Sequence, residues 1–216
     1  MTPKINPSDQ QSFETTTWLS ITGANPDHAA FYISRWEGFE AEGKDIDGEA
    51  RLIDAMAPRG ARILDAGAGT GRVAAYLAAR GHEVTAVDID PQLVSYVQQH
   101  YADVPVNWNV GDLAVNDGEG AVPVGPFDVI VSAGNVLAFI PESAHRAALR
   151  VLAQRLAPEG RLVVGFGLGR GRSAAEFFAD ATAAGLTRSQ TFSSWDLQPF
   201  TEESDFLVAV LTVAAR

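Results

Sequence analysis

Short apolar runs alternate with segments of helical spacing through most of the chain. The apolar run at residues 62–66 precedes a segment in which Val73, Tyr76 and Leu77 share one face of a helix. The same alternation predicts strands at 82–89, 105–110, 127–132 and 161–166, and helices at 48–57, 91–100, 141–156 and 173–184. Strands connected by helices predict a three-layer, doubly wound α/β fold with a mainly parallel sheet.

The C-terminal part of the chain breaks this alternation. Residues 187–195 and 205–214 are predicted to be strands, and no helical segment lies between them. Two consecutive strands joined by a loop form an antiparallel pair. We therefore expect the last strand to run antiparallel to the rest of the sheet.

The N-terminal part is irregular apart from one segment. Apolar residues at helical spacing predict an amphipathic helix over residues 27–40, on which Phe31 and Phe39 would dock against the core. We expect this N-terminal extension, residues 1–45, to be distinct from a ligand-binding domain over residues 46–216.

Composition narrows the classes of partner. The 216-residue chain has a net charge of −11 and a pI near 4.7, which disfavours nucleic acids and anionic membrane surfaces. It contains no cysteine, so disulfides, thiolate metal sites and thiol nucleophiles are excluded, and we expect no metal site. No apolar run reaches membrane-spanning length, and the sequence predicts a cytoplasmic protein. It does not indicate the oligomeric state.

A glycine-rich loop follows the first predicted strand. It reads Asp-Ala-Gly-Ala-Gly-Thr-Gly over residues 65–71, and glycines let the backbone turn tightly and approach a ligand. In an open parallel sheet such a loop lies at the carboxyl ends of the strands, where ligands bind. The dinucleotide fingerprint would require a glycine where Arg72 stands, which counts against NAD.

Carboxylates gather at the same edge of the predicted sheet. Asp65 precedes the glycines, Asp88 ends the second strand, and Asp112 follows the third. Such a group of negative charges would repel a pyrophosphate but favour a cationic ligand. The carboxylate that ends the second strand can accept hydrogen bonds from ribose hydroxyls, and Asp112 can accept one from an exocyclic amine. S-adenosylmethionine (SAM) combines a ribose, an adenine, an ammonium and a sulfonium, without a phosphate.

The run ILDAGAGTGRVAAYLAARGHEVTAVDID and the phrase PEGRLVVGF resemble class I, Rossmann-like SAM-dependent methyltransferases. The resemblance extends from about Gly48 to the C-terminus. It implies a seven-stranded sheet of order 3-2-1-4-5-7-6 with strand 7 antiparallel, and an N-terminal helical lid. The Asn-Pro-Pro-Tyr pattern of amino and base N-methyltransferases is absent after the fourth strand, so the chain is more similar to the small-molecule branch.

The resemblance also implies roles for particular residues. The expected cofactor-binding residues are Asp65, Gly67, Ala68, Gly69, Arg72, Asp88, Ile89, Asp112, Leu113, Ser132, Ala133 and Gly134. The expected substrate-binding residues are Tyr32, Trp36, Asn135 and Trp195. Arg170 and Arg172 are candidates to bind an acidic substrate group, although a solvated loop is the simpler interpretation. No catalytic residue is predicted, because a general base is needed only when the acceptor arrives protonated.

Four functions remain open at this point. The first is methyl transfer from SAM to an unidentified small molecule. The second is a nicotinamide-dependent oxidoreductase of similar fold, which the residue at position 72 disfavours. The third is a SAM-binding module without catalytic activity, which nothing in the sequence excludes. The fourth is a use of SAM for a reaction other than methyl transfer in the same pocket.

Overall fold

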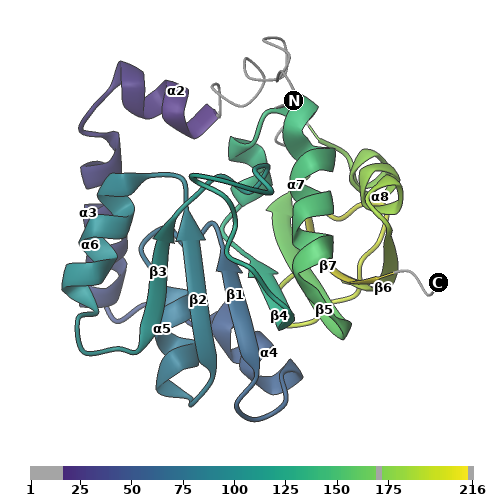
Figure 1. Ribbon diagram of the computed structural model, residues 1–216, viewed down its shortest axis with the longest axis horizontal. Coiled ribbons are helices and arrows are strands. Elements are labelled where there is room, and N and C mark those ends of the chain that lie inside the picture. The colour runs from purple at the N-terminus through teal and green to yellow at the C-terminus, as the bar shows by residue number, and fades with distance from the viewer. Residues whose placement is uncertain (1–16, 169–171, 214–216) are drawn as a thin grey trace, which may run out of the picture.

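A computed structural model of the chain describes residues 17–168 and 172–213. Seven strands form one sheet in the order β3-β2-β1-β4-β5-β7-β6, which confirms the predicted order (Figure 1). The strands are β1 Arg62–Ala66, β2 Glu83–Asp88, β3 Val106–Val110, β4 Phe127–Ser132, β5 Leu156–Gly167, β6 Leu186–Phe192 and β7 Phe206–Val213.

Strand direction divides the sheet into two parts. β1 pairs in parallel with β2 and β4, and the parallel pairing continues outward to β3 and β5. β7 is antiparallel to both of its neighbours, β5 and β6, as the missing final helix predicted. The carboxyl ends of β1 to β4 therefore lie along one edge of the sheet, from which their following loops emerge (Figure 1).

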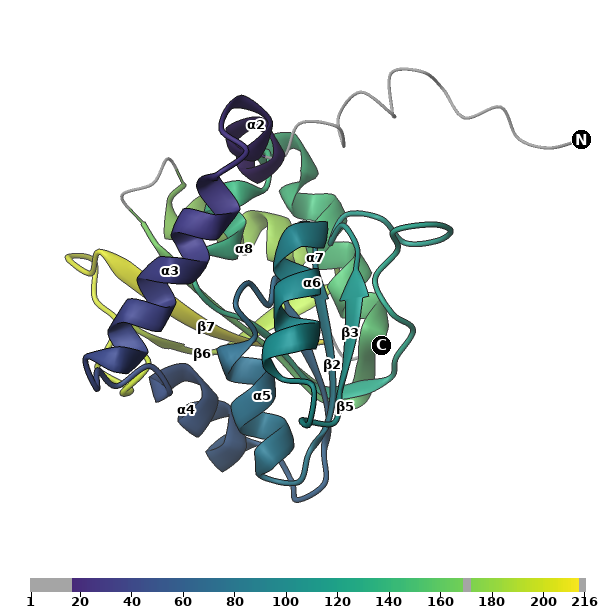
Figure 2. The same ribbon diagram turned by 90° about the vertical axis from the view of Figure 1, so that its left-hand side faces the viewer.

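Helices cover both faces of the sheet (Figures 1 and 2). α4, α5 and α6 lie on one face, whereas α7 and α8 lie on the other. The helices are α2 Thr17–Ala24, α3 His28–Ala41, α4 Gly48–Met56, α5 Arg72–Ala79, α6 Pro91–His100, α7 Glu142–Arg155 and α8 Ala174–Ala183, with a short 3-10 helix, η1, at Val136–Phe139. In the described parts of the chain, no helix combines the length and apolar character needed to span a membrane.

Each face of the sheet has its own hydrophobic core. Successive side chains of a strand point to opposite faces, so Ile63 packs with α4 and α5, whereas Leu64 packs with α7 and α8. Both side chains are fully buried. This burial on two sides explains why the central strands are continuous apolar runs rather than alternating ones.

The structure corrects three details of the sequence interpretation. β5 begins at Leu156, earlier than predicted, because Leu156 already pairs with Phe127 of β4; the Pro-Glu-Gly segment falls in an irregularity of the strand before the pairing resumes at Arg161. α2 was not predicted. Phe31 does not dock against the core: its side chain is 64% exposed, because α3 packs through Ala29, Tyr32 and Ile33 instead.

The N-terminal helices α2 and α3 lie over the carboxyl-end edge of the sheet (Figures 1 and 2). α2 contacts η1, and α3 contacts α6. A small third core, in which Trp18 and Ala29 pack with Leu93 of α6, joins these helices to the domain. The first 16 residues of the predicted N-terminal extension lie outside the described residues.

Candidate active site

The glycine-rich loop between β1 and α5 has the backbone conformation that glycine alone adopts readily. Gly67 and Gly71 have φ angles of +85° and +76°. A Cβ atom at Gly67 would lie 2.5 Å from a Val136 methyl group, and one at Gly71 would lie 2.7 Å from the Trp108 ring. Glycine is therefore required at both positions by conformation and by space.

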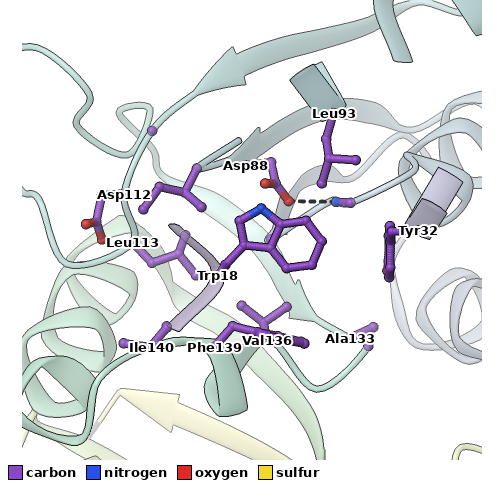
Figure 3. Close-up of a pocket in the computed structure, with 15 residues that line it drawn as sticks. Trp18, Tyr32, Asp88, Leu93, Asp112, Leu113, Ala133, Val136, Phe139 and Ile140 are labelled. Atoms are coloured by element: carbon purple, nitrogen blue, oxygen red, sulfur yellow. Dashed lines mark hydrogen bonds between the residues drawn. The ribbon is translucent and has the colours of Figure 1, made fainter. Parts of the chain in front are cut away.

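A cavity opens beside this loop, at the carboxyl ends of the parallel strands (Figure 3). Among the described residues, its lining contains no lysine or arginine, and Asp88 and Asp112 are its two carboxylates. We call it the first cavity. It is lined by Trp18, Tyr32, Gly67, Gly69, Asp88, Ile89, Leu93, Gly111, Asp112, Leu113, Ala133, Gly134, Val136, Phe139 and Ile140.

Asp88 is held in place by backbone groups at the end of β2. Its two carboxylate oxygens accept hydrogen bonds from the amides of Gly69, at 2.8 Å, and Asp90, at 3.0 Å. Burial raises the pKa of Asp88 to about 6, partly offset by these two hydrogen bonds. Burial likewise raises the pKa of Asp112, whose carboxylate accepts from the Ala114 amide at 2.8 Å.

Two polar groups lie buried at the ends of β1 and β4 without a partner. Among the described residues, nothing hydrogen-bonds to Oδ2 of Asp65 or to Oγ of Ser132. Burial raises the pKa of Asp65 to about 7. Each residue is only 2% exposed, and neither lines the first cavity. A buried polar atom without a partner costs free energy, so this arrangement favours a ligand that supplies charge nearby.

Trp18 of α2 covers the first cavity (Figure 3). Its indole nitrogen donates to Oδ2 of Asp90 at 2.7 Å, and the other oxygen of Asp90 caps α6 by accepting from the Gln92 amide. Its ring makes edge contacts with Tyr32 and Phe139, with centroids 5.4 Å apart in both cases. The buried hydrogen bond and the aromatic contacts fix α2 over the cavity.

A second cavity adjoins the first. The two share Trp18, Tyr32, Gly134 and Phe139 in their walls. The remaining lining residues of the second cavity are Ile21, His28, Phe31, Arg35, Trp36, Glu49, Arg72, Asn135, Trp195 and Phe206. A ligand in one cavity would therefore lie next to a ligand in the other, with the shared residues around their meeting point.

Comparisons with known proteins identify this arrangement. A model of the methyltransferase domain family matches residues 63–160. The crystal structure of a TehB-like SAM-dependent methyltransferase from Corynebacterium glutamicum is 48% identical, with a TM-score of 0.82, over 88% of this chain and 100% of that chain. The chain belongs to the SAM-dependent methyltransferase family. This confirms the predicted resemblance and sets aside the nicotinamide-dependent alternative.

Other relatives match a smaller part of the chain or only the fold. An uncharacterized methyltransferase from Mycobacterium tuberculosis is 38% identical over 52% of this chain and 54% of that protein. The chain thus spans about half the length of such curated relatives. The CcbJ methyltransferase from Streptomyces caelestis has a TM-score of 0.67 at 21% identity, over 78% of this chain and 90% of that chain, and shows the fold alone.

Eight of the twelve expected cofactor-binding residues line the first cavity of this methyltransferase. They are Gly67, Gly69, Asp88, Ile89, Asp112, Leu113, Ala133 and Gly134. Asp65, Ala68 and Ser132 do not line the first cavity, and Arg72 lines the second. That these twelve residues bind the cofactor stays a prediction.

Arg72 lies at the start of α5 but faces the second cavity. Its guanidinium forms two hydrogen bonds with the Glu49 carboxylate, at 2.8 and 2.5 Å, and lies 4.4 Å from the centre of the Trp36 ring. It also donates to the backbone carbonyl of Ile46. These contacts fix α4 and α3 against the glycine loop, which is a structural reason for an arginine at this position.

All four expected substrate-binding residues line the second cavity. Tyr32 and Trp36 come from α3, Asn135 from the loop after β4, and Trp195 from the loop after β6. Asn135 has a positive φ of 64°, and its side chain accepts from the Gly167 amide at 2.7 Å, so it also ties two loops together. Their contact with a substrate stays a prediction.

Six residues of the first cavity were not predicted from the sequence. They are Trp18, Leu93, Gly111, Val136, Phe139 and Ile140. Val136 ends the stretch 132–136, which stands where the family has its fourth-strand motif, and Phe139 follows three residues later in η1, so extending that stretch would have found it. Trp18 lies in a stretch of the sequence with no clear periodicity, and no sequence signal indicates its position.

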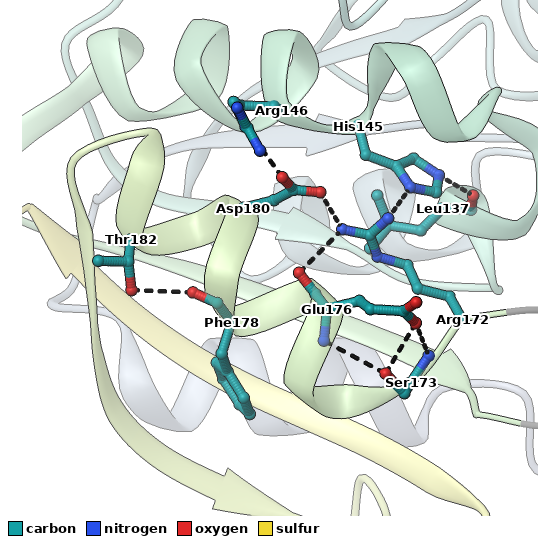
Figure 4. A network of polar contacts seen from close by, with 9 residues as sticks. All are labelled: Leu137, His145, Arg146, Arg172, Ser173, Glu176, Phe178, Asp180 and Thr182. Carbon is teal, nitrogen blue, oxygen red and sulfur yellow. Dashed lines mark hydrogen bonds and ion pairs between the residues drawn. The ribbon is translucent and has the colours of Figure 1, made fainter.

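Arg172 lines neither of these two cavities, and its burial shows that the solvated-loop interpretation is wrong; a role in binding an acidic substrate group stays a prediction. Its guanidinium contacts the carboxylate of Asp180 and Nδ1 of His145, and its side chain is 9% exposed (Figure 4). The second arginine of that suggestion, Arg170, lies outside the described residues.

Proposed function

We propose that the methyltransferase transfers the methyl group of SAM to a small-molecule acceptor, with SAM in the first cavity and the acceptor in the second. The observation that carries this proposal is the shared wall of Trp18, Tyr32, Gly134 and Phe139 between a carboxylate-bearing cavity and an aromatic one. A donor site and an acceptor site that meet at one wall are what group transfer between two bound molecules requires.

The residues of the first cavity fit SAM in charge and shape. Asp88 has lone pairs free beyond its two backbone hydrogen bonds, and these can accept from ribose hydroxyls. The apolar side chains of Ile89 and Leu113 offer surfaces for an adenine ring. The unpartnered oxygen of Asp65 would be stabilised by a nearby positive charge. No lysine or arginine in the lining is available for a phosphate.

When bound, SAM would supply a methyl group already activated by its sulfonium. The acceptor forms a bond to the methyl carbon with its lone pair, while the electron pair of the carbon–sulfur bond goes to the sulfur. Any proton on the acceptor atom leaves to solvent or to a base. The chain contributes by orienting the two molecules and excluding water, a contribution of several kcal/mol in oriented reactions.

Tyr32 is well placed to contribute to that orientation. Its hydroxyl lies near Gly69, where an added Cβ atom would be 3.2 Å away, and its ring forms part of the shared wall. Burial raises the pKa of Tyr32, so the hydroxyl remains protonated and available as a hydrogen-bond donor. The catalytic group, if the acceptor needs one, is not assigned.

Incubation with methyl-labelled SAM and a metabolite extract tests the proposed function. We expect a labelled small molecule in mass spectra and one S-adenosylhomocysteine released for each methyl group transferred. Saturable binding of SAM without release of S-adenosylhomocysteine would instead identify a binding module without catalytic activity.

Three further expectations belong to this proposal. A small-molecule acceptor, rather than a nucleic acid, is consistent with the net charge of −11 and with the aromatic lining of the second cavity. A cytoplasmic location and a lid function for the N-terminal extension stay predictions. A ubiquinone biosynthesis O-methyltransferase of Xanthomonas axonopodis is among the relatives, at 34% identity over 50% of this chain and 43% of that protein, and it supports a small-molecule acceptor.

A further inference from the structure

Arg35 stands at the second cavity as a cation without an acidic partner. It lies on α3, its side chain is exposed, and its guanidinium carbon is 5.2 Å from the centre of the Tyr32 ring. Among the residues that the structure describes, no carboxylate lies within ion-pairing distance of Arg35. The other arginine of this cavity, Arg72, is neutralised by Glu49.

Aromatic rings form much of the rest of the cavity. Trp18, Tyr32 and Phe139 come from the wall shared with the first cavity, whereas Trp195 and Phe206 lie on the side of β5 and β7. Trp195 is fixed because its ring packs against Gly165, where any side chain would collide with it. Rings held in this way offer flat surfaces on which a planar molecule can stack.

We infer that the acceptor is a planar aromatic acid, whose anionic group binds Arg35 and whose ring lies among the aromatic side chains of the second cavity. This inference rests on the proposed function, because it takes the second cavity as the acceptor site. The guanidinium group is planar and presents paired N–H donors that match a carboxylate. In a chain of net charge −11, an unpaired arginine at a cavity mouth also attracts an anion that the rest of the surface repels.

The carboxylate of SAM itself is a second anionic group that Arg35 could bind. Arg35 lines only the second cavity, and the lining of the first contains no arginine, which favours the acceptor as the source. The two sources differ in what the loss of Arg35 would do. If the arginine binds the cofactor, its removal weakens cofactor binding; if it binds the acceptor, cofactor binding is unchanged.

Calorimetry on the full chain, with S-adenosylhomocysteine at saturation, tests the inference. The probes are 2-naphthoate and 2-naphthamide, which share a ring system but differ in charge. We expect the wild type to bind the anion about tenfold more tightly than the amide, the preference that one charge-assisted contact near the surface provides. In Arg35→Ala the preference should disappear, while the affinity for S-adenosylhomocysteine stays the same.

Arg188→Ala is the matched control, because Arg188 is also exposed and lies 5.0 Å from the centre of an aromatic ring, that of Phe178. It lines neither cavity and should keep the full preference. Equal binding of the two probes to the wild type, or weaker binding of S-adenosylhomocysteine by Arg35→Ala, would overturn the inference alone. Absence of S-adenosylhomocysteine binding to the wild type would overturn the proposed function as well.

Discussion

Two groups of buried polar residues lie on different sides of this molecule, and they differ in how fully their hydrogen bonds are made. The first group, Asp65 and Ser132, lies behind the first cavity, and each residue leaves an oxygen without a partner in the described structure. The second group, His145, Arg172 and Asp180, joins α7 to α8 and is almost fully connected (Figure 4).

The connections of the second group fix the protonation of its histidine. The Arg172 guanidinium donates to Nδ1 of His145, which leaves Nε2 to donate to the Leu137 carbonyl at 2.9 Å. Burial, together with the charge of Arg172, lowers the pKa of His145, so the ring stays neutral. In this group, only Nε of Arg172 lacks a partner among the described residues.

The difference separates structural polar groups from groups that await a ligand. A connected network satisfies its own charges and holds two helices in one arrangement. A buried carboxylate that leaves one oxygen without a partner and has a raised pKa, as Asp65 does, costs stability in the free protein, and a cationic ligand would lower that cost. Both groups contain charged residues, so the nature of the residues does not distinguish them, but their hydrogen bonding does.

Breaking the connected network should have the largest effect. Asp180→Ala removes the carboxylate that neutralises Arg172 and leaves a buried charge, so we expect a loss of about 3–5 kcal/mol in the free energy of unfolding. Urea denaturation measures this loss, and SAM affinity should not change. Arg146→Ala is the control, because Arg146 contacts the same carboxylate from the surface and should cost less than about 1 kcal/mol. Equal costs for the two variants would refute a structural role for the network.

The second prediction concerns Asp88, whose charge acts on Asp65 of the first group. Asp88→Ala removes the carboxylate proposed to accept from the ribose, and we expect SAM affinity to fall by about 100-fold, or about 2.7 kcal/mol, in calorimetric titrations. The control is Asp128→Ala: Asp128 also accepts a backbone hydrogen bond, from Arg62 at 2.8 Å, but at the opposite end of β1. A loss of affinity in the control as large as that in Asp88→Ala would argue against a specific site.

A variant of Asp65 tests how much its unpartnered oxygen lowers the free energy of unfolding. Its pKa is raised to about 7 in the folded protein, so at pH 8 folding retains a buried charge that is absent at pH 4. Asp65→Asn should therefore increase the free energy of unfolding at pH 8 by about 1–3 kcal/mol, with little gain near pH 4. Urea denaturation at the two pH values measures this, and the variant should also bind SAM more weakly. Equal stability at pH 8 would contradict the account.

The smallest expected effect is that of pH on the affinity for SAM. The pKa of Asp88 is raised to about 6, so at pH 5 about one tenth of the free protein carries the ionised carboxylate. If SAM binds the ionised form, its affinity should fall about tenfold between pH 7.5 and pH 5. Asp88→Asn, which cannot ionise, should show a smaller dependence over the same range. Affinity that rises toward pH 5 would contradict a role for the carboxylate.

Most element boundaries could be predicted because the hydrophobic pattern has a direct physical cause, whereas the strand order was implied by the family resemblance. Central strands buried on both faces must be apolar throughout, and the helices between them keep one apolar face, as for Val73 and Leu77 in α5. β5 was placed too late because its first residues include Pro158 and Gly160, which are typical of turns and here fall in an irregularity of the strand, after the pair of Leu156 with Phe127.

Site residues could be predicted where the chain signals them locally. Gly67 and Asp88 lie directly at strand ends, so their position follows from the fold. Trp18 reaches the same cavity from α2, whose eight residues include two threonines, a serine and a glycine, all weak helix formers. Its position depends on a hydrogen bond to Asp90, 72 residues away, and no local pattern indicates such a contact.

A crystal structure of the full chain with S-adenosylhomocysteine tests the central claim most directly. We predict density for the nucleoside in the first cavity, with its ribose hydroxyls within hydrogen-bonding distance of Asp88 and its sulfur facing the wall shared with the second cavity. Crystals saturated with the ligand that show the first cavity empty, or the ligand bound elsewhere, would contradict the account.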